Sequence, residues 1–279
     1  MKIGLALGGG ASRGIAHIAM LEAFDELGIK PAAIAGCSIG ALIGAGYAGG
    51  MSALEIRDHA LVMLSTRTNM ARHIFGARHT RLKDIIALKG LHSLQIEGHT
   101  IADIFLPDHL AKKIEDLAIP FHVVTTDYDR LEEVVLRTGS VSHAVGASIA
   151  IPGLIAAPRL NGRLHIDGAS INPVPFEHVR EGCDFVVAID VIGRPRAALE
   201  RSPSNIELAI GSALIMAREL AEMKRRLNPP EIYIYPNIDE FGPADFFKVR
   251  EILEAAHPAK QELKRELDRV INAALQKTP

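Results

Sequence analysis

One run of the sequence limits the possible folds more than any other. From Pro31 to Leu54 no residue carries a charged side chain, and a run of this length can cross a bilayer. Gly36, Gly40 and Gly44 also have the spacing of close helix packing in lipid. Yet glycines crowd the run and bulky apolar side chains are few, so a membrane-spanning helix is the less favoured interpretation. The alternative is a buried strand that leads directly into a buried helix.

The composition excludes several classes of protein. The 279 residues are 48% hydrophobic and 23% charged, which is typical of one large globular domain or two small ones. A formal net charge of −2 gives no electrostatic support to a nucleic-acid partner. Cys37 and Cys183 are the two cysteines, too few for a disulfide framework or a metal-binding cluster. The start, MKIGLALGGG, is too short an apolar run for a signal peptide, so we expect a cytoplasmic protein with no transmembrane helix.

Strand-like and helix-like segments alternate along the chain. Short apolar runs predict strands at residues 3–7, 32–36, 121–126, 134–136, 164–166, 184–190 and 232–235. Amphipathic or apolar runs predict helices at 14–27, 39–47 and 206–223, and a last helix that begins after Pro258. This alternation indicates an α/β sandwich with a mostly parallel central sheet.

The serine inside the uncharged run lies in a motif typical of nucleophiles. Residues 36–40 read Gly-Cys-Ser-Ile-Gly, which is G-x-S-x-G where a predicted strand turns into a predicted helix. Such a turn holds the serine Oγ clear of the sheet, and Gly36 and Gly40 let neighbouring backbone pack without Cβ clashes. The helix that follows points its N–H groups at the same place. Because a lone G-x-S-x-G also arises by chance, Ser38 is at this point only a candidate nucleophile.

A glycine-rich loop follows the first predicted strand. Gly8, Gly9 and Gly10 expose successive N–H groups beside the strand end, which suits an anion or an oxyanion. Gly8, Gly10 and Gly14 also approximate a dinucleotide-binding fingerprint. That fingerprint expects an acidic residue at the end of the second strand, where this chain has a glycine, a cysteine and Ser38. Nucleotide binding is therefore the less favoured alternative.

The group that would activate Ser38 is not evident among the histidines. An α/β-hydrolase places its serine several strands into the fold and adds an acid and a histidine, whereas Ser38 has room for one strand before its own. None of the twelve histidines stands out. Asp167 is the candidate base, because it follows the predicted strand 164–166 and begins the sequence Asp-Gly-Ala. Taken alone, Asp-Gly more often marks a hairpin turn.

The glycine loop, the serine motif and Asp-Gly-Ala at a strand end together resemble the patatin-like phospholipase family. The resemblance is strongest to its short bacterial members and to the catalytic domain of neuropathy target esterase. It runs from Lys2 to about Asp190 and includes GASIAIPGLIAAP at 146–158 and INPVPF at 171–176. It implies a patatin-like three-layer α/β sandwich with helices on both faces, formed as one domain over residues 1–279. The motifs lie in residues 2–190, and the resemblance thins over 191–279.

The resemblance also implies residue roles. Ser38 matches the nucleophile and Asp167 the general base of a Ser-Asp dyad. Gly8, Gly9 and Gly10 match the oxyanion loop, with Arg13 as its neighbouring cation. The glycines that support these motifs are Gly14, Gly36, Gly40 and Gly168. Ala11 departs from the family pattern, where many members have a further glycine, and because alanine favours ordinary φ the N–H donor there is less expected.

The implied reaction is acyl-ester hydrolysis through an acyl-serine, with no metal and no organic cofactor. A carboxylate is a weak base for a hydroxyl. Burial must therefore raise its pKa, and oxyanion donors must stabilise the charge that forms.

The substrate is less defined by the sequence. We expect a lipid or other acyl ester, and phospholipid, lysophospholipid, simple ester and thioester all stay open. Residues 66–92 carry six Lys and Arg side chains against Asp84, typical of a solvated loop or of a patch that makes peripheral contact with anionic membranes. The apolar residues that follow, predicted to form a lid, are Ile101, Ile104, Phe105 and Leu106. A nucleotide-binding module and a non-catalytic scaffold on a hydrolase fold are the alternatives from other classes.

Overall fold

A computed structural model describes residues 1–65, 96–194 and 205–275 of the chain. Within these ranges one eight-stranded sheet has the order β10-β9-β1-β2-β4-β8-β7, with β5 beside β4. Its strands are β1 (Ile3–Leu7), β2 (Ala33–Cys37), β4 (Phe121–Asp127), β5 (Glu132–Leu136), β7 (Arg159–Leu160), β8 (Arg163–Asp167), β9 (Phe185–Ile189) and β10 (Ile232–Ile234). A two-stranded sheet pairs β3 (Ile96–Glu97) with β6 (Ile155–Ala156).

The central sheet is mostly parallel, as the sequence predicts. β10, β9, β1, β2 and β4 are parallel neighbours, whereas β5 and β8 run antiparallel to β4. In this register Leu7 of β1 lies opposite Gly36 of β2. The loop after β1 and the turn after β2 therefore lie at the same edge of the sheet.

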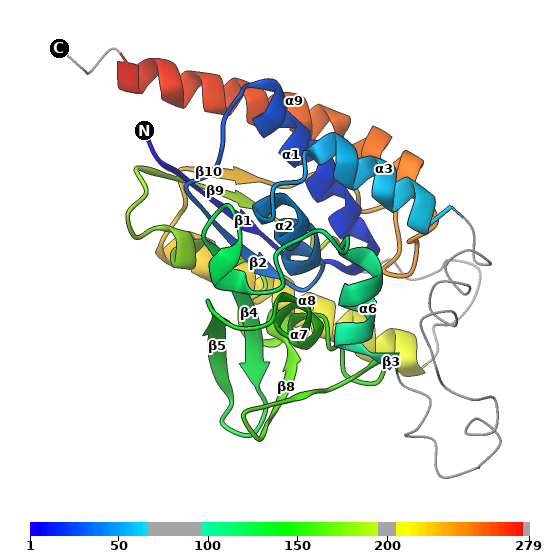
Figure 1. Cartoon of the computed structure of the whole chain (residues 1–279). Coiled ribbons are helices and arrows are strands. Elements are labelled where there is room, and N and C mark those ends of the chain that lie inside the picture. The colour runs from blue at the N-terminus through cyan, green and yellow to red at the C-terminus, as the bar shows by residue number, and fades with distance from the viewer. Residues whose placement is uncertain (66–95, 195–204, 276–279) are drawn as a thin grey trace, which may run out of the picture.

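Helices cover both faces of the sheet (Figure 1). They are α1 (Ala16–Glu26), α2 (Ile39–Ala48), α3 (Ala53–Met63), α6 (Gly98–Phe105), α7 (Val141–Ser148), α8 (Asn205–Leu227) and α9 (Val249–Leu275). Short 3₁₀ turns are η1 (Ala11–Ile15), η3 (Ile114–Asp116), η4 (Gly168–Ser170) and η5 (Phe176–Val179). In Figure 1, α9, α1 and α3 lie on one side of the sheet and α8 lies on the other.

Alternate residues of one strand pack into different layers. In β1, Leu5 and Leu7 join a large apolar cluster with α1, α2, α3 and α9. Ala6 joins a smaller cluster with η5 and α8 on the other face. Because both faces are buried, the strand is apolar throughout and lacks a polar alternation.

The last helix corrects one prediction. We expected it to begin after Pro258, but α9 begins at Val249 and holds Pro258 in its interior. Proline lacks the N–H that would bond the carbonyl of residue 254. Ile252 and Ala256 before it, and Leu263 after it, are fully buried, so packing against α1 keeps both parts of the segment helical.

The C-terminal elements share the sheet and the core of the rest of the chain, since β10 pairs with β9 and α9 packs on α1. This packing agrees with one domain over residues 1–279, which stays a prediction. The uncharged run is β2 followed by α2, as the alternative interpretation predicts. Across the described ranges, no helix combines the length and the apolar character needed to cross a membrane.

Candidate active site

Ser38 lies on the tight turn between β2 and α2. Its backbone has φ 54° and ψ −123°, a left-handed conformation that costs a non-glycine residue about 1–2 kcal/mol. Its carbonyl accepts the N–H groups of Ala41 and Leu42, which begins α2. The residue is 5% exposed, and its Oγ donates a hydrogen bond of 2.6 Å to Oδ2 of Asp167.

Asp167 reaches Ser38 through strand pairing. It ends β8 and pairs with Thr125 of β4, the strand beside β2. Its Oδ1 accepts the N–H of Ala169 at 2.8 Å, so the Asp-Gly-Ala sequence forms a 3₁₀ turn and not a hairpin. Burial raises the pKa of Asp167 to about 6, while the hydrogen bonds from Ser38 and Ala169 act in the opposite direction. The carboxyl group can thus be ionised at neutral pH and still accept a proton.

The glycine loop passes directly against Ser38, but not all its N–H groups are available. A Cβ on Gly9 would stand 3.3 Å from the Cβ of Ser38. The Gly8 N–H donates to the carbonyl of Ile189 at 3.0 Å, and the Gly9 N–H to that of Pro173 at 2.9 Å. We expected both glycines to offer N–H groups to an oxyanion. Their donors are used to hold the loop against its neighbours.

The donors left over lie on either side of the serine. Within the described ranges, the N–H groups of Gly10, Ala11 and Ile39 donate to no hydrogen-bond partner. Ala11 and Ile39 line the same cavity as Ser38. Ala11 has φ 53°, which corrects the expectation of ordinary φ at this position. The chain thus takes the left-handed conformation there although it carries an alanine.

The guanidinium of Arg13, which we expected as the neighbouring cation of the oxyanion loop, is buried and already donates to backbone carbonyls. Arg13 is 1% exposed, and its guanidinium donates to the carbonyls of Phe241 at 2.8 Å and Ile192 at 2.7 Å, with a longer bond to Arg194. Neutral carbonyls satisfy the buried charge. Arg13 therefore ties the glycine loop to two segments that lie much later in the chain.

Three of the four supporting glycines lie where backbones approach closely, and the fourth, Gly14, lies against a side chain. A Cβ on Gly40 would stand 2.2 Å from the carbonyl oxygen of Leu7, which no residue but glycine can accept. Gly36 meets the backbone of α2, Gly168 meets that of β4, and Gly14 packs on the side chain of the residue after Ser38.

Sequence reasoning did not single out Ser148, which is fully buried at the end of α7. Its Oγ accepts the N–H of Ser38 at 2.8 Å and donates to the carbonyl of Val124 at 2.6 Å. The Ser148 hydroxyl therefore links the strained turn at Ser38 to β4 through two hydrogen bonds. A lone hydroxyl in the apolar run 144–151 was the available signal.

His17 has a structural role. His17 is fully buried, and its Nε2 donates to the carbonyl of Gly8 at 2.8 Å. Burial lowers the pKa of His17 to about 4, so the ring is neutral at physiological pH. Where the structure describes the chain, no histidine ring hydrogen-bonds to Ser38 or Asp167.

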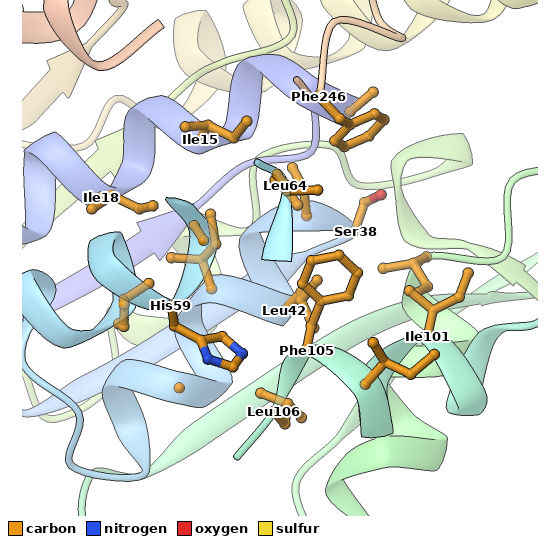
Figure 2. A pocket seen from close by; sticks show the side chains of 18 of the residues that line it. Ile15, Ile18, Ser38, Leu42, His59, Leu64, Ile101, Phe105, Leu106 and Phe246 are labelled. Carbon is orange, nitrogen blue, oxygen red and sulfur yellow. The ribbon is translucent and has the colours of Figure 1, made fainter. Parts of the chain in front are cut away.

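An apolar cavity of about 310 Å³ lies beside Ser38. Apart from Ser38 and His59, the described residues that line it are apolar or glycine. Figure 2 shows Leu42 and Phe105 between Ser38 and His59 in this view. The residues predicted as a lid, Ile101, Ile104, Phe105 and Leu106, form part of its wall. The basic segment 66–92 lies outside the described residues.

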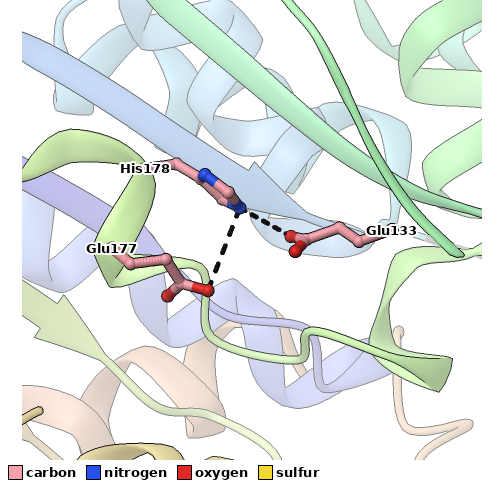
Figure 3. A group of neighbouring side chains, drawn as sticks. All are labelled: Glu133, Glu177 and His178. Carbon is pink, nitrogen blue, oxygen red and sulfur yellow. Dashed lines mark hydrogen bonds and ion pairs between the residues drawn. The ribbon is translucent and has the colours of Figure 1, made fainter.

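A polar cluster elsewhere could offer ligands to a metal ion (Figure 3). Ligand atoms of Glu133, Glu177 and His178 lie within 4.8 Å of one another. The His178 Nε2 already bonds Glu133 at 2.6 Å, and the Asn172 amide donates to both carboxylates. The Lys224 ammonium pairs with Oε1 of Glu177, the oxygen that also accepts from Asn172. These donors engage one oxygen of each carboxylate in an ion-pair network that links β5, η5 and α8, while Oε2 of Glu177 is buried without a hydrogen-bond partner among the described residues.

The fold and the geometry at Ser38 define a class: an α/β protein with a buried serine, hydrogen-bonded to an aspartate, on the turn from a strand to a helix. The patatin-like phospholipase family model matches residues 5–180. The chain belongs to the patatin-like phospholipase family.

Relatives in other organisms include the lysophospholipase NTE1 of Cryptococcus neoformans, 34% identical over 68% of this chain and 11% of its own. An uncharacterized NTE family protein of Mycobacterium tuberculosis is 32% identical over 74% of this chain and 53% of its own. Rat patatin-like phospholipase domain-containing protein 7 is 29% identical over 91% of this chain and 20% of its own. The chain thus spans between about a tenth and about half the length of these relatives. Among solved structures, VipD from Legionella pneumophila aligns over 95% of this chain and 66% of its own, with 16% identity and a TM-score of 0.47.

Proposed function

We propose that this chain is a serine acyl hydrolase that cleaves carboxylic esters of lipids, either phospholipids or lysophospholipids. The observation that carries the proposal is the 2.6 Å hydrogen bond from Ser38 Oγ to the buried Asp167, beside an apolar cavity. Family membership and a relative named as a lysophospholipase support a lipid substrate.

In the proposed reaction, Ser38 and Asp167 act as a dyad. Oδ2 of Asp167 takes the Ser38 proton while Oγ bonds to the ester carbonyl carbon. The oxygen that becomes negative is stabilised by the N–H groups of Gly10, Ala11 and Ile39. The bond to the alcohol then breaks, and Asp167 returns the proton to the departing oxygen. Water repeats the sequence on the acyl-serine, which releases the acid and restores Ser38.

The test compares the native chain with Ser38→Ala on phospholipid, lysophospholipid, short soluble esters and acyl thioesters. We expect lipid-ester hydrolysis that disappears in the variant, and a fluorophosphonate probe that labels the native chain at Ser38 alone. Labelling at another residue, or hydrolysis that survives the substitution, would contradict the dyad. Activity confined to soluble esters or thioesters would favour a general carboxylesterase or thioesterase. Saturable nucleotide binding with no hydrolysis would favour the nucleotide-binding alternative.

We also infer peripheral membrane contact through the basic segment 66–92, which the charge of that segment supports. Vesicle association should rise with anionic lipid content and weaken with salt, since exposed charges are screened beyond roughly 10 Å at 0.1 M. Reversing Arg78, Arg81 and Lys83 to glutamate should impair hydrolysis on vesicles while a short soluble ester is still cleaved. Equal losses on both substrates would mean that the segment shapes the site itself.

A further inference from the structure

The cavity beside Ser38 runs along α2, because residues from the N-cap of that helix to its last turn line it. One face of α2 presents Ser38, Leu42 and Gly46 to it, which are positions i, i+4 and i+8. At about 1.5 Å per residue this row is about 12 Å long. α3 presents a second row with the same spacing, from Ile56 to Leu64. The two rows of lining residues, one from α2 and one from α3, therefore give the cavity the same length of about 12 Å.

The end of these rows that is far from Ser38 lies at the turn from α2 to α3. Met51, in that turn, and Ile56 both line the cavity. A Cβ on Gly46 would stand 3.3 Å from Sδ of Met51 and 3.7 Å from Cδ1 of Ile56. Gly46 therefore packs against these two side chains at that end, and a larger side chain at position 46 would displace them or enter the cavity.

The length of these rows gives a capacity for an alkyl chain. With C–C bonds of about 1.5 Å and angles of about 111°, an extended chain advances about 1.25 Å per carbon, so 12 Å takes about ten carbons. The cavity of about 310 Å³ is large enough to take such a chain.

We propose that this cavity is a channel for one unbranched acyl chain of about ten to twelve carbons, and that Gly46 and Met51 set that length. The inference rests on the proposed function, because the acyl carbonyl must lie at Ser38. The substrate class it names is a medium-chain acyl ester, engaged one tail at a time.

The test uses binding, with Ser38→Ala protein and saturated fatty acids of six to sixteen carbons, by titration calorimetry below their micelle concentrations. Affinity should rise about fourfold per methylene and stop rising at about ten to twelve carbons. Adding Gly46→Leu should move this break to shorter chains by up to about four carbons, and adding Met51→Ala should move it to longer chains. Val62→Ala, at an exposed position on α3, is the control that should leave the break in place.

The outcomes separate the two proposals. An affinity that keeps rising to sixteen carbons, or a break that neither Gly46→Leu nor Met51→Ala moves, overturns the channel. Gly46→Ala, which adds one methyl group and should move the break by about one carbon, replaces Gly46→Leu if that variant does not fold. Failure of the proposed function is seen elsewhere, as an absence of hydrolysis by the native chain, because the binding profile is measured on protein that lacks Ser38.

Discussion

Asp167→Asn should abolish ester hydrolysis and yet stabilise the fold at neutral pH. Asp167 is 5% exposed, and burial raises its pKa from 3.8 to about 6. A carboxyl whose pKa is higher in the folded chain stabilises the fold fully below about pH 4 and loses this contribution as the pH rises through about 6. A difference of about 2 in pKa means that the free energy of unfolding is lower by about 3 kcal/mol above this pH range than below it. The asparagine amide does not ionise, so the variant avoids this cost.

Urea unfolding of both proteins measures the effect. The free energy of unfolding of Asp167→Asn, minus that of the native chain, should increase by about 2 kcal/mol between about pH 4 and pH 7.5. Hydrolysis should fall by several orders of magnitude, because the amide cannot take the Ser38 proton. A difference in stability that does not change with pH would refute the reasoning, as would a variant that still turns over.

Asp190→Asn is the matched control. Asp190 is equally buried, burial raises its pKa, and it accepts hydrogen bonds from Tyr233 and the Ile192 N–H. This variant should share the sign of the pH-dependent stability change while fluorophosphonate still labels Ser38. Loss of labelling in both variants would mean that burial of charge, and not the base role of Asp167, explains the loss of activity.

Three further substitutions test the supports of the site. Arg13→Met should lower the free energy of unfolding by about 3 kcal/mol, because it leaves buried carbonyls unpaired, and a loss below 1 kcal/mol in urea unfolding would contradict the role described above. Ala11→Gly should stabilise the fold by up to about 1 kcal/mol, since glycine takes φ 53° without strain, and a lower thermal midpoint would count against it. Ser148→Ala should lower kcat by about tenfold with little change in KM, because the Ser38 turn loses its brace; a change in KM alone would assign Ser148 to substrate binding.

Local features of the sequence predicted most strands of the central sheet. The strand and helix around Ser38 are adjacent in the chain, and glycines that meet backbone atoms permit no other turn there. The predicted strands begin and end within a few residues of the observed ones because buried parallel strands are continuous apolar runs between glycines and charges. The predicted start of the last helix was wrong. The helix continues through Pro258 because Ile252 and Leu263 pack on α1, and local propensity does not report that packing.

The details of the site depend on partners far away in the sequence. Which glycine N–H groups are available is decided by the carbonyls of Ile189 and Pro173, and no spacing within the loop reveals them. Arg13 likewise finds its acceptors 179 and 228 residues later. The loop motif identifies residues that must lie near one another, but only tertiary pairing assigns each hydrogen-bond donor.

The tie between Arg13 and Phe241 has a consequence for synthesis on the ribosome. Ser12 also donates its Oγ–H to the carbonyl of Gly242, so the loop beside Ser38 is anchored by residues made long after it. At 5–20 residues per second, the 228 residues between Arg13 and Phe241 take on the order of 10–50 s to translate. During that interval Ser38 and Asp167 have both been synthesised, but the glycine loop still lacks its hydrogen bond to Phe241. The proposed hydrolytic activity should therefore arise late in translation, when the segment around Phe241 emerges and folds back.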